Sequence, residues 1–254
     1  MTDDIYRADP SLRGKLRRRL VRLYHRHPAM TAPPGPMISF SFDDAPRSAA
    51  TTGASILETY NARGTFLVCG ALTGTTFTTG LLASDAELVD LHRRGHEIGC
   101  HTLDHIDCGQ MDELTIRRSL DANAGVLTGL GLPSPTAFAY PYGDVSSGAK
   151  RAVATRFRLA RGLHPGLVGK GTDLHQAPAL GLEGEQSLAQ ARHWMARALR
   201  ETAWLILFTH NVHDDPGEFD ISSAGFEGLV RDAKGQGFQF VTLSEGARLV
   251  GGGS

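Results

Sequence analysis

Short apolar runs alternate with longer segments of helical periodicity along most of the chain. The runs predicted to be strands are Met37–Phe42, Thr65–Cys69, Glu97–Cys100, Thr136–Tyr140, Phe157–Ala160 and Trp204–Phe208. The segments predicted to be helices are Arg47–Ala62, Ser84–Arg94, Met111–Leu130, Val145–Thr155, Ser187–Glu201 and Ser222–Lys234. The segments Phe238–Leu243 and Ser244–Leu249 close the series.

Repeated strand–helix units favour a parallel sheet with helices on its outer side. About seven such units between Pro36 and Val250 fit a barrel better than an open sheet. Ser84 followed by Glu87 predicts a capping box at the start of one helix. The glycine-rich stretch 161–185 is weakly patterned, so its strand content is not predicted.

The N-terminus has a different character. The first thirty residues carry eight Lys/Arg against three Asp. Apolar positions at helical spacing predict a basic amphipathic helix with Leu12, Leu16, Leu20, Leu23 and Tyr24 on one side. Such a helix either lies across the main domain or contacts a membrane surface or a partner, and a transit peptide is a third alternative.

No apolar region of signal-peptide length follows these charges, which favours a cytoplasmic protein. A Pro-rich stretch then marks a linker. The predicted organisation is therefore a basic helix and linker at 1–35, one domain at 36–250 and a flexible glycine tail at 251–254.

Composition narrows the class of protein. The net charge of -1 and pI near 6.8 argue against a nucleic-acid binder. No run of 18 apolar residues is present, so no membrane-spanning helix is expected. Three cysteines, Cys69, Cys100 and Cys108, are too few for a disulfide scaffold and are expected to be reduced.

Two adjacent carboxylates, Asp43 and Asp44, directly follow the first predicted strand. Because the carboxyl ends of parallel strands form the rim where α/β active sites lie, both acids are expected at one edge of the sheet. One can ligate a metal while the other acts as a base. The alternative is a pair of helix-capping aspartates ahead of Pro46.

His101 and His105 follow the third predicted strand. Two histidines four positions apart can meet on one face of a helical turn and hold one metal ion. Histidine pairs at this spacing also arise by chance on surfaces. Cys100 beside them is either a soft ligand or, as we favour, a buried strand cysteine.

Two further strands also end in polar or aromatic residues. The fourth strand runs into Tyr140-Pro141-Tyr142-Gly143, a turn that can aim a backbone N–H at an oxyanion, or that is a plain loop. His210 follows the run ending at Phe208 and can serve as a general acid near neutral pH. His213 and Asp214 come next and either orient His210 or replace it.

Four such clusters thus stand at the ends of four predicted strands. One Asp with two His is a common divalent-metal set that leaves positions open for water and substrate. The second carboxylate and the third histidine would supply a base and an acid. This combination predicts a metal-assisted hydrolase.

On these motifs the sequence resembles the polysaccharide deacetylase family, the NodB-homology domain of carbohydrate esterase family 4. The resemblance covers roughly Pro36–Val250 and rests on SFDDA at 41–45, HTLDH at 101–105, AYPYG at 139–143 and FTH at 208–210. It implies an α/β fold, a distorted (β/α)7 barrel of NodB-homology type, here with an extra N-terminal helix.

The resemblance also implies roles for the metal-binding residues and for the base. Asp43 would be the general base. Asp44, His101 and His105 would hold one divalent metal ion, which would polarise the acetyl carbonyl and activate water. Zinc is the expected metal, with cobalt, iron or nickel as alternatives.

The remaining implied roles concern the substrate. The backbone N–H of Tyr142 would complete the oxyanion hole, and His210 would protonate the leaving group. Tyr140, Pro141 and Phe208 would bind substrate, with Phe208 lining the pocket for the acetyl methyl group.

Three positions depart from the family pattern. Ala139 stands where the family has an arginine that braces the base, and Ala45 replaces a glycine. The fourth motif, an Asp near a Trp that tunes the catalytic histidine, has no clear match. Asp173 is a candidate stand-in for that Asp.

The favoured function is metal-dependent hydrolysis of N- or O-acetyl groups from a saccharide, with release of acetate. An acetylated saccharide is the expected partner, and no nucleic acid is expected. The alternatives are hydrolysis of a small, including cyclic, amide and a non-catalytic saccharide-binding protein.

Overall fold

The computed structural model describes residues 11, 14, 16, 20–184, 186–217 and 219–251. Most of the predicted N-terminal helix lies outside these residues, although Gly14, Leu16, Leu20 and Val21 are helical. Of the predicted glycine tail, only Gly251 is described. No helix in the described part of the chain combines the length and apolarity needed to cross a membrane.

The main sheet has eight parallel strands, in the order β7–β6–β5–β2–β1–β9–β8, with β10 also paired to β1. The strands are β1 Met37–Phe42, β2 Thr65–Val68, β5 Glu97–Cys100, β6 Ala137–Ala139, β7 Leu159–Arg161, β8 Leu180–Gly181, β9 Trp204–Thr209 and β10 Gln239–Phe240. A separate hairpin joins β3 Thr76–Phe77 to β4 Gly80–Leu81. The strands predicted from the sequence are confirmed, while β8 falls in the stretch that had no predicted strand.

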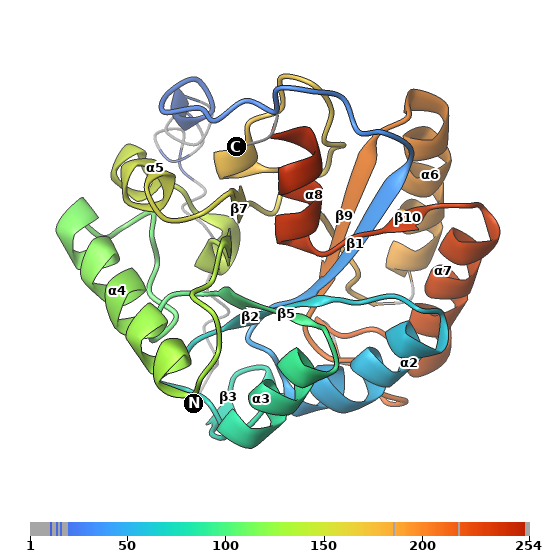
Figure 1. Ribbon diagram of the computed structural model, residues 1–254, viewed down its shortest axis with the longest axis horizontal. Coiled ribbons are helices and arrows are strands. Elements are labelled where there is room, and N and C mark those ends of the chain that lie inside the picture. Colours follow the sequence, from blue (N-terminus) through green and yellow to red (C-terminus); the bar gives the residue numbers. More distant parts are fainter. Residues whose placement is uncertain are drawn as a thin grey trace.

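The sheet curls into a half-barrel, which confirms the predicted fold class (Figure 1). The chain from Ala177 to Gly181 connects its two edges. Ala177 bridges Arg161 of β7, and Gly181 pairs with Phe208 of β9. The weakly patterned stretch therefore links β7 to β9.

Helices surround the outer side of the curled sheet (Figure 1). They are α2 Ala54–Thr59, α3 Asp85–Arg93, α4 Glu113–Gly129, α5 Ser147–Ala154, α6 Gln186–Glu201 and α7 Ser223–Gly235. The remaining elements are α8 Leu243–Val250, a π-helix at Ala49–Gly53 and 3-10 turns at Pro141–Gly143 and Leu174–Gln176. The predicted capping box is confirmed, since Ser84 Oγ accepts from the Glu87 N–H and the Glu87 carboxylate accepts from the Ser84 N–H.

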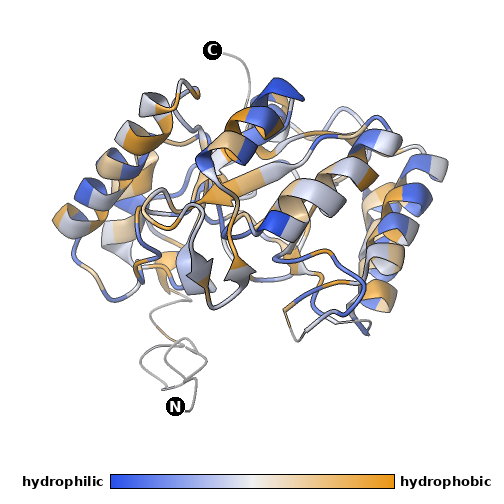
Figure 2. Ribbon diagram, turned by 90° about the horizontal axis from the view of Figure 1, so that it is seen from below, coloured by the Kyte–Doolittle hydropathy of each residue, from blue (hydrophilic) through white to orange (hydrophobic). Residues whose placement is uncertain are grey.

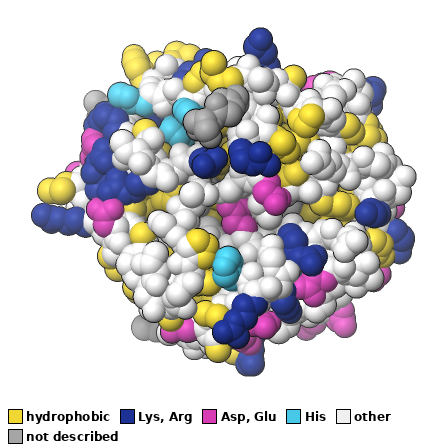
Figure 3. Space-filling view, in the orientation of Figure 1, with side chains coloured by type: hydrophobic (Ala, Val, Ile, Leu, Met, Phe, Trp, Pro, Cys, Tyr) yellow, Lys and Arg dark blue, Asp and Glu magenta, His cyan; other side chains and the backbone are white. Residues whose placement is uncertain are grey.

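Burial explains why the strands read as continuous apolar runs. All six residues of β1 are buried. Ile38, Phe40 and Phe42 belong to the core under the outer helices, whereas Met37 packs with Leu67, Ile206 and other residues of the barrel interior. Figure 2 shows hydrophobic strands inside helices that carry hydrophilic stretches. On the face shown in Figure 3, Lys and Arg lie among Asp and Glu, as the net charge leads one to expect.

The last helix, α8, packs on the barrel interior. Leu243, Ala247 and Val250 join the interior cluster that contains Trp204. Thr242 and Glu245 form a capping box at its start. A Cβ atom at Gly246 would lie 2.3 Å from Trp204 Cζ2, so only glycine allows this approach.

We therefore predict that Gly246→Ala destabilises the fold by about 1–3 kcal/mol through overpacking. Thermal unfolding followed by circular dichroism would measure the change. Gly125→Ala in α4 is the matched control, because a Cβ there meets no atom within 4 Å and should stabilise by about 0.5–1 kcal/mol. Equal stability of the parent and Gly246→Ala would contradict the packing argument.

Candidate active site

The parallel strands bring the predicted functional residues to one edge of the sheet. Asp43 and Asp44 follow β1, His101 and His105 follow β5, and His210 follows β9. Both carboxylates are buried, with 4% of Asp43 and 3% of Asp44 exposed. A pair of solvated helix-capping acids would be exposed, so that alternative does not describe them.

Asp44, His101 and His105 form a group suited to a metal ion, with ligand atoms all within 4.8 Å of one another. His105 Nε2 lies 3.5 Å and His101 Nε2 3.9 Å from Asp44 Oδ1. This oxygen is buried and has no hydrogen-bond partner among the described residues. The other carboxylate oxygen, Oδ2, accepts a 3.0 Å hydrogen bond from Thr79.

His101 and His105 are both in the neutral form that can ligate a metal ion. Burial lowers the pKa of both His101 and His105 to about 4, so both rings are neutral at physiological pH. The contact of His101 Nδ1 with the Ala139 carbonyl, at 2.9 Å, fits an Nδ1–H donor and leaves the Nε2 lone pair facing Asp44. Neutral imidazoles and an unpartnered carboxylate oxygen fit a divalent metal ion.

A nearby positive charge would stabilise the ionised form of the buried Asp44 carboxylate. Burial and the neighbouring Asp43 charge raise its pKa above the usual value. A cation held by the Asp/His/His group would favour the ionised form of Asp44.

Asp43 has a different partner, which the sequence did not indicate. Arg161, at the end of β7, donates from Nη2 to Asp43 Oδ1. Burial opposes ionisation of Asp43, but the Arg161 guanidinium overrides it and holds the pKa of Asp43 below its usual value. Asp43 is therefore an ionised, buried carboxylate, as a general base must be.

Arg161 reaches Asp43 across the barrel interior, because β1 and β7 are not neighbours in the sheet. The side chain is fully buried, and its Cζ lies 4.6 Å from the centroid of the Phe208 ring. Its register partner on β6 is Ala139, the position where the family pattern has an arginine. The small Ala139 side chain leaves room for an arginine that arrives from the next strand.

Backbone conformation is unusual around the site. Five non-glycine residues there are left-handed: Asp44 (φ 61°), Ala45 (φ 50°), Thr102 (φ 68°), His105 (φ 59°) and Tyr142 (φ 57°). Such conformations cost energy for side-chain-bearing residues and persist where the surroundings fix them. They turn the chain sharply at the ends of β1, β5 and β6.

Aromatic rings enclose the His105 imidazole. The Tyr142 ring meets it edge-on at 4.6 Å between centroids, and Phe77 of the β3–β4 hairpin meets it at 5.4 Å. Phe77 and Thr79 were not predicted as site residues, since no motif marks the hairpin. Phe77 packs on His105 and Thr79 donates to Asp44, so the hairpin contacts two members of the Asp/His/His group.

Among the charged groups around the carboxylates, His210 contributes to lowering the pKa of Asp43 and that of Asp44. Its Nδ1 is 3.4 Å from the Phe219 carbonyl oxygen. The idea that His213 or Asp214 orients it is wrong. His213 contacts Asp220 at 3.2 Å instead, and Asp214 is exposed.

Two other predictions need correction. The Tyr140 side chain is fully buried against Phe138, and its hydroxyl donates to the His175 carbonyl at 2.9 Å, so it cannot line a substrate site. Asp173 does not stand in for the fourth motif. It accepts from Lys150 Nζ and from the His27 N–H, whereas the His210 ring contacts Phe219.

Pro141 and Phe208, the other residues expected to bind substrate, adjoin residues of the site. Pro141 is buried at the start of the turn that carries Tyr142. Phe208 is almost fully buried and carries Arg161 on its ring. The three cysteines are free and buried, and Cys100 accepts a hydrogen bond from Asn123, which confirms the strand-cysteine interpretation.

Fold and site together define a parallel half-barrel with an Asp/His/His group and a second, arginine-paired carboxylate at its rim. The sequence model of the polysaccharide deacetylase family matches residues 31–159, and the chain belongs to this family. The bifunctional xylanase/deacetylase of Pseudobutyrivibrio xylanivorans is 23% identical over 210 residues, which cover 82% of this chain. The chain spans only 30% of the length of that relative.

Solved structures share the fold. A Mycobacterium smegmatis protein assigned as a polysaccharide deacetylase is 19% identical, with a TM-score of 0.67 over 88% of this chain and 94% of that one. The chitin deacetylase of Colletotrichum lindemuthianum gives 14% identity and a TM-score of 0.59 over 85% and 90% of the two chains. A Clostridium thermocellum family 4 acetyl xylan esterase, solved with a cobalt ion, gives 21% and 0.54 over 84% and 91%.

The geometry predicts that Asp44→Ala and His105→Ala each lose metal. Because even outer-shell changes weaken metal sites about 10–100-fold, loss of a ligand should weaken binding by more than that. Equilibrium dialysis against zinc or cobalt with elemental analysis would measure the bound ion. The control is Asp104→Ala, which removes an exposed carboxylate from the same motif. Undiminished metal content in both ligand variants would contradict the assignment.

Proposed function

We propose that this chain is a divalent-metal-dependent deacetylase that hydrolyses N- or O-acetyl groups of a saccharide and releases acetate. The observation that carries the proposal is the pairing of an ionised buried carboxylate, Asp43, with an adjacent Asp44/His101/His105 group. Membership of the polysaccharide deacetylase family supports the carbohydrate substrate class.

Asp44, His101 and His105 would hold the ion. Bound there, a divalent cation supplies Lewis acidity that polarises an acyl carbonyl and makes a water molecule more acidic. The metal-binding chemistry of two imidazoles and a carboxylate accommodates zinc as well as cobalt, iron or nickel.

The chain's own groups would then manage protons and charge. Asp43 Oδ2 is left to accept the proton of the attacking water, since Arg161 engages Oδ1. The backbone N–H of Tyr142 donates to the oxyanion that develops on the former carbonyl. His210 protonates the departing amine or alcohol, and the 3.4 Å contact of its Nδ1 with the Phe219 carbonyl keeps Nε2 available.

Phe208 would meet the acetyl methyl group with the part of its ring that Arg161 does not cover. The aromatic surfaces of Tyr142 and Phe77 around His105 provide apolar contact area of the kind that sugar rings pack on. These residues support a saccharide as the substrate.

The proposal predicts acetate release from members of a panel of acetylated sugars by the zinc- or cobalt-loaded protein. Asp43→Asn should lower the rate by about a hundredfold to ten-thousandfold, because it removes the proton acceptor while keeping its shape. Metal content should stay at the parent level.

The control is Asp232→Asn, which alters a surface carboxylate paired with Arg192 and should leave the rate unchanged. An enzyme-coupled acetate assay measures both. No acetate from any sugar, with metal confirmed bound, would overturn the proposal and favour a small-amide hydrolase or a saccharide-binding protein. Full activity of Asp43→Asn would remove Asp43 as the base.

A second prediction concerns Arg161. Arg161→Ala should lower kcat about a hundredfold, since a reacting group that is misplaced by about 1 Å loses that much. The double variant Ala139→Arg/Arg161→Ala restores an arginine to the neighbouring strand at the same level of the barrel and should recover much of the rate.

Thermal unfolding of each variant separates this effect from simple loss of the fold. Arg161→Lys, which keeps the charge but not the planar donor fork, should be intermediate. Equal activity of a folded Arg161→Ala protein and the parent would show that Asp43 needs no partner.

A further inference from the structure

The N-terminal segment, defined here by its described residues between Ser11 and Met30, presents apolar side chains to solvent. Exposed fractions are 58% for Leu16, 42% for Leu20, 71% for Leu23, 56% for Tyr24 and 60% for Met30. These are half of the ten large hydrophobic side chains that are exposed in the described chain. The concentration in one short segment sets it apart from the rest of the surface.

The opposite side of the segment is fixed to the barrel. Val21 is buried in the core cluster that contains Tyr140, and Lys150 Nζ donates to the Val21 carbonyl at 3.0 Å. The His27 N–H donates to Asp173 Oδ1 at 2.9 Å, and the His27 ring stacks on His175 at 4.6 Å between centroids. The exposed leucines therefore belong to a segment that Val21 and His27 fix to the barrel.

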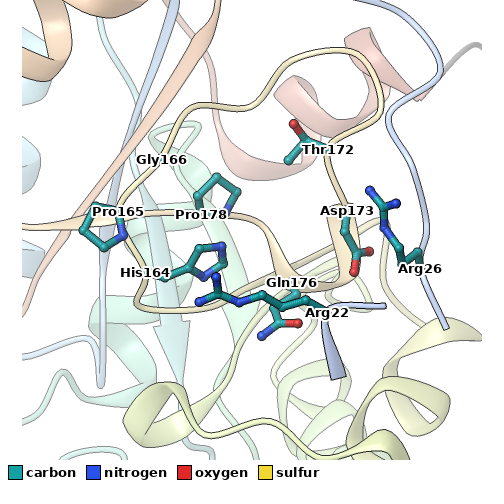
Figure 4. Close-up of a pocket in the computed structure, with 9 residues that line it drawn as sticks. All are labelled: Arg22, Arg26, His164, Pro165, Gly166, Thr172, Asp173, Gln176 and Pro178. Atoms are coloured by element: carbon teal, nitrogen blue, oxygen red, sulfur yellow. The ribbon is translucent and has the colours of Figure 1, made fainter. Parts of the chain in front are cut away.

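A cavity of about 250 Å³ lies between this segment and the chain from His164 to Pro178. Figure 4 shows Arg22 beside His164 and Gln176, and Arg26 beside Asp173. Arg26 Nη2 donates to the Gly171 carbonyl at 2.6 Å, and Lys150 engages the Asp173 carboxylate. The two guanidinium groups thus face the cavity, and they belong to the same short segment as the exposed apolar side chains.

The sequence strengthens this charge asymmetry. Seven Lys or Arg lie between positions 13 and 26, whereas no Asp or Glu occurs from 10 to 42, although the whole chain has a net charge of -1. A nucleic acid or an acidic protein surface would use the cations and leave the leucines in water. An anionic bilayer surface uses both, because apolar side chains enter the headgroup region while cations meet lipid phosphates.

We propose that the N-terminal segment docks this protein on an anionic lipid surface. Leu16, Leu20 and Leu23 insert among the headgroups, and the four arginines and one lysine of positions 13–19 bind their negative charges. The contact is peripheral and reversible, and it tethers the half-barrel through the Val21 and His27 anchors. It is independent of the deacetylase activity proposed above.

The test is co-sedimentation of the full chain with vesicles of phosphatidylcholine, with and without phosphatidylglycerol. We expect binding only to the vesicles with phosphatidylglycerol, and loss of binding as salt is raised. Leu16→Ser/Leu20→Ser/Leu23→Ser should weaken binding by about tenfold or more. Arg17→Gln/Arg18→Gln/Arg19→Gln should weaken it by roughly a hundredfold, at about fivefold per cation.

The matched control is Met111→Ser/Leu114→Ser/Val126→Ser, which removes three exposed apolar side chains of or beside α4 and should bind like the parent. Thermal unfolding confirms that every variant is folded, and acetate release should be the same for the leucine variant and the parent. Three results would each overturn the proposal. The parent protein could bind equally to vesicles with and without phosphatidylglycerol, or bind to neither. The control variant could lose as much binding as the leucine variant.

Sedimentation equilibrium without lipid tests whether a second copy of this chain, instead of lipid, binds the exposed apolar side chains. A parent dimer that dissociates in the leucine variant, together with no vesicle binding, would assign the apolar face to a second copy of this chain and overturn the lipid proposal. A monomer that binds vesicles is the expected result.

Discussion

Two adjacent carboxylates, Asp43 and Asp44, are buried at the rim of the barrel, and their negative charge has to be balanced inside the protein. Taking one carboxylate out of water costs several kcal/mol even after relaxation. Arg161 balances Asp43 through a direct contact across the interior. Asp44 faces two neutral histidines instead, and a bound cation is the remaining source of positive charge for it.

This division of partners separates the roles of two chemically identical side chains. The carboxylate that touches a guanidinium stays ionised and is tied at one oxygen, so the other oxygen is free to take a proton. The carboxylate beside the imidazoles has one oxygen without a hydrogen-bond partner among the described residues, and this oxygen lies 3.5 Å and 3.9 Å from their Nε2 atoms. Their neighbours in space, rather than their own chemistry, make one suited to be a base and the other a ligand.

The sequence predicted the parts of this site that are local. SFDDA at 41–45 and HTLDH at 101–105 each follow a buried strand, and parallel pairing carries both to one edge. Ser84 and Glu87 likewise form a capping-box pattern, which predicts the start of a helix from four consecutive residues. Arg161 could not be found in this way, because its partner lies 118 positions away and across the barrel. Its one local signal was its position at the end of a predicted strand, which the other clusters share. The left-handed turns at Asp44, His105 and Tyr142 were equally invisible, since nothing in those residue types requires them.

The central place of β1 has a consequence for how the chain acquires its structure. The first strand partner of β1 along the chain is β2, which follows within about thirty residues. By contrast, the Ser41 hydroxyl of β1 donates to the Leu207 carbonyl, 166 positions further on. The partner strand β10 comes still later in the chain. A nascent chain leaving the ribosome would hold β1 with one side unpaired until most of the protein had been made. Contacts of such long range slow folding. The apolar strand that delivers the two aspartates thus stays exposed on one side for most of the synthesis, which gives a chaperone reason to cover it.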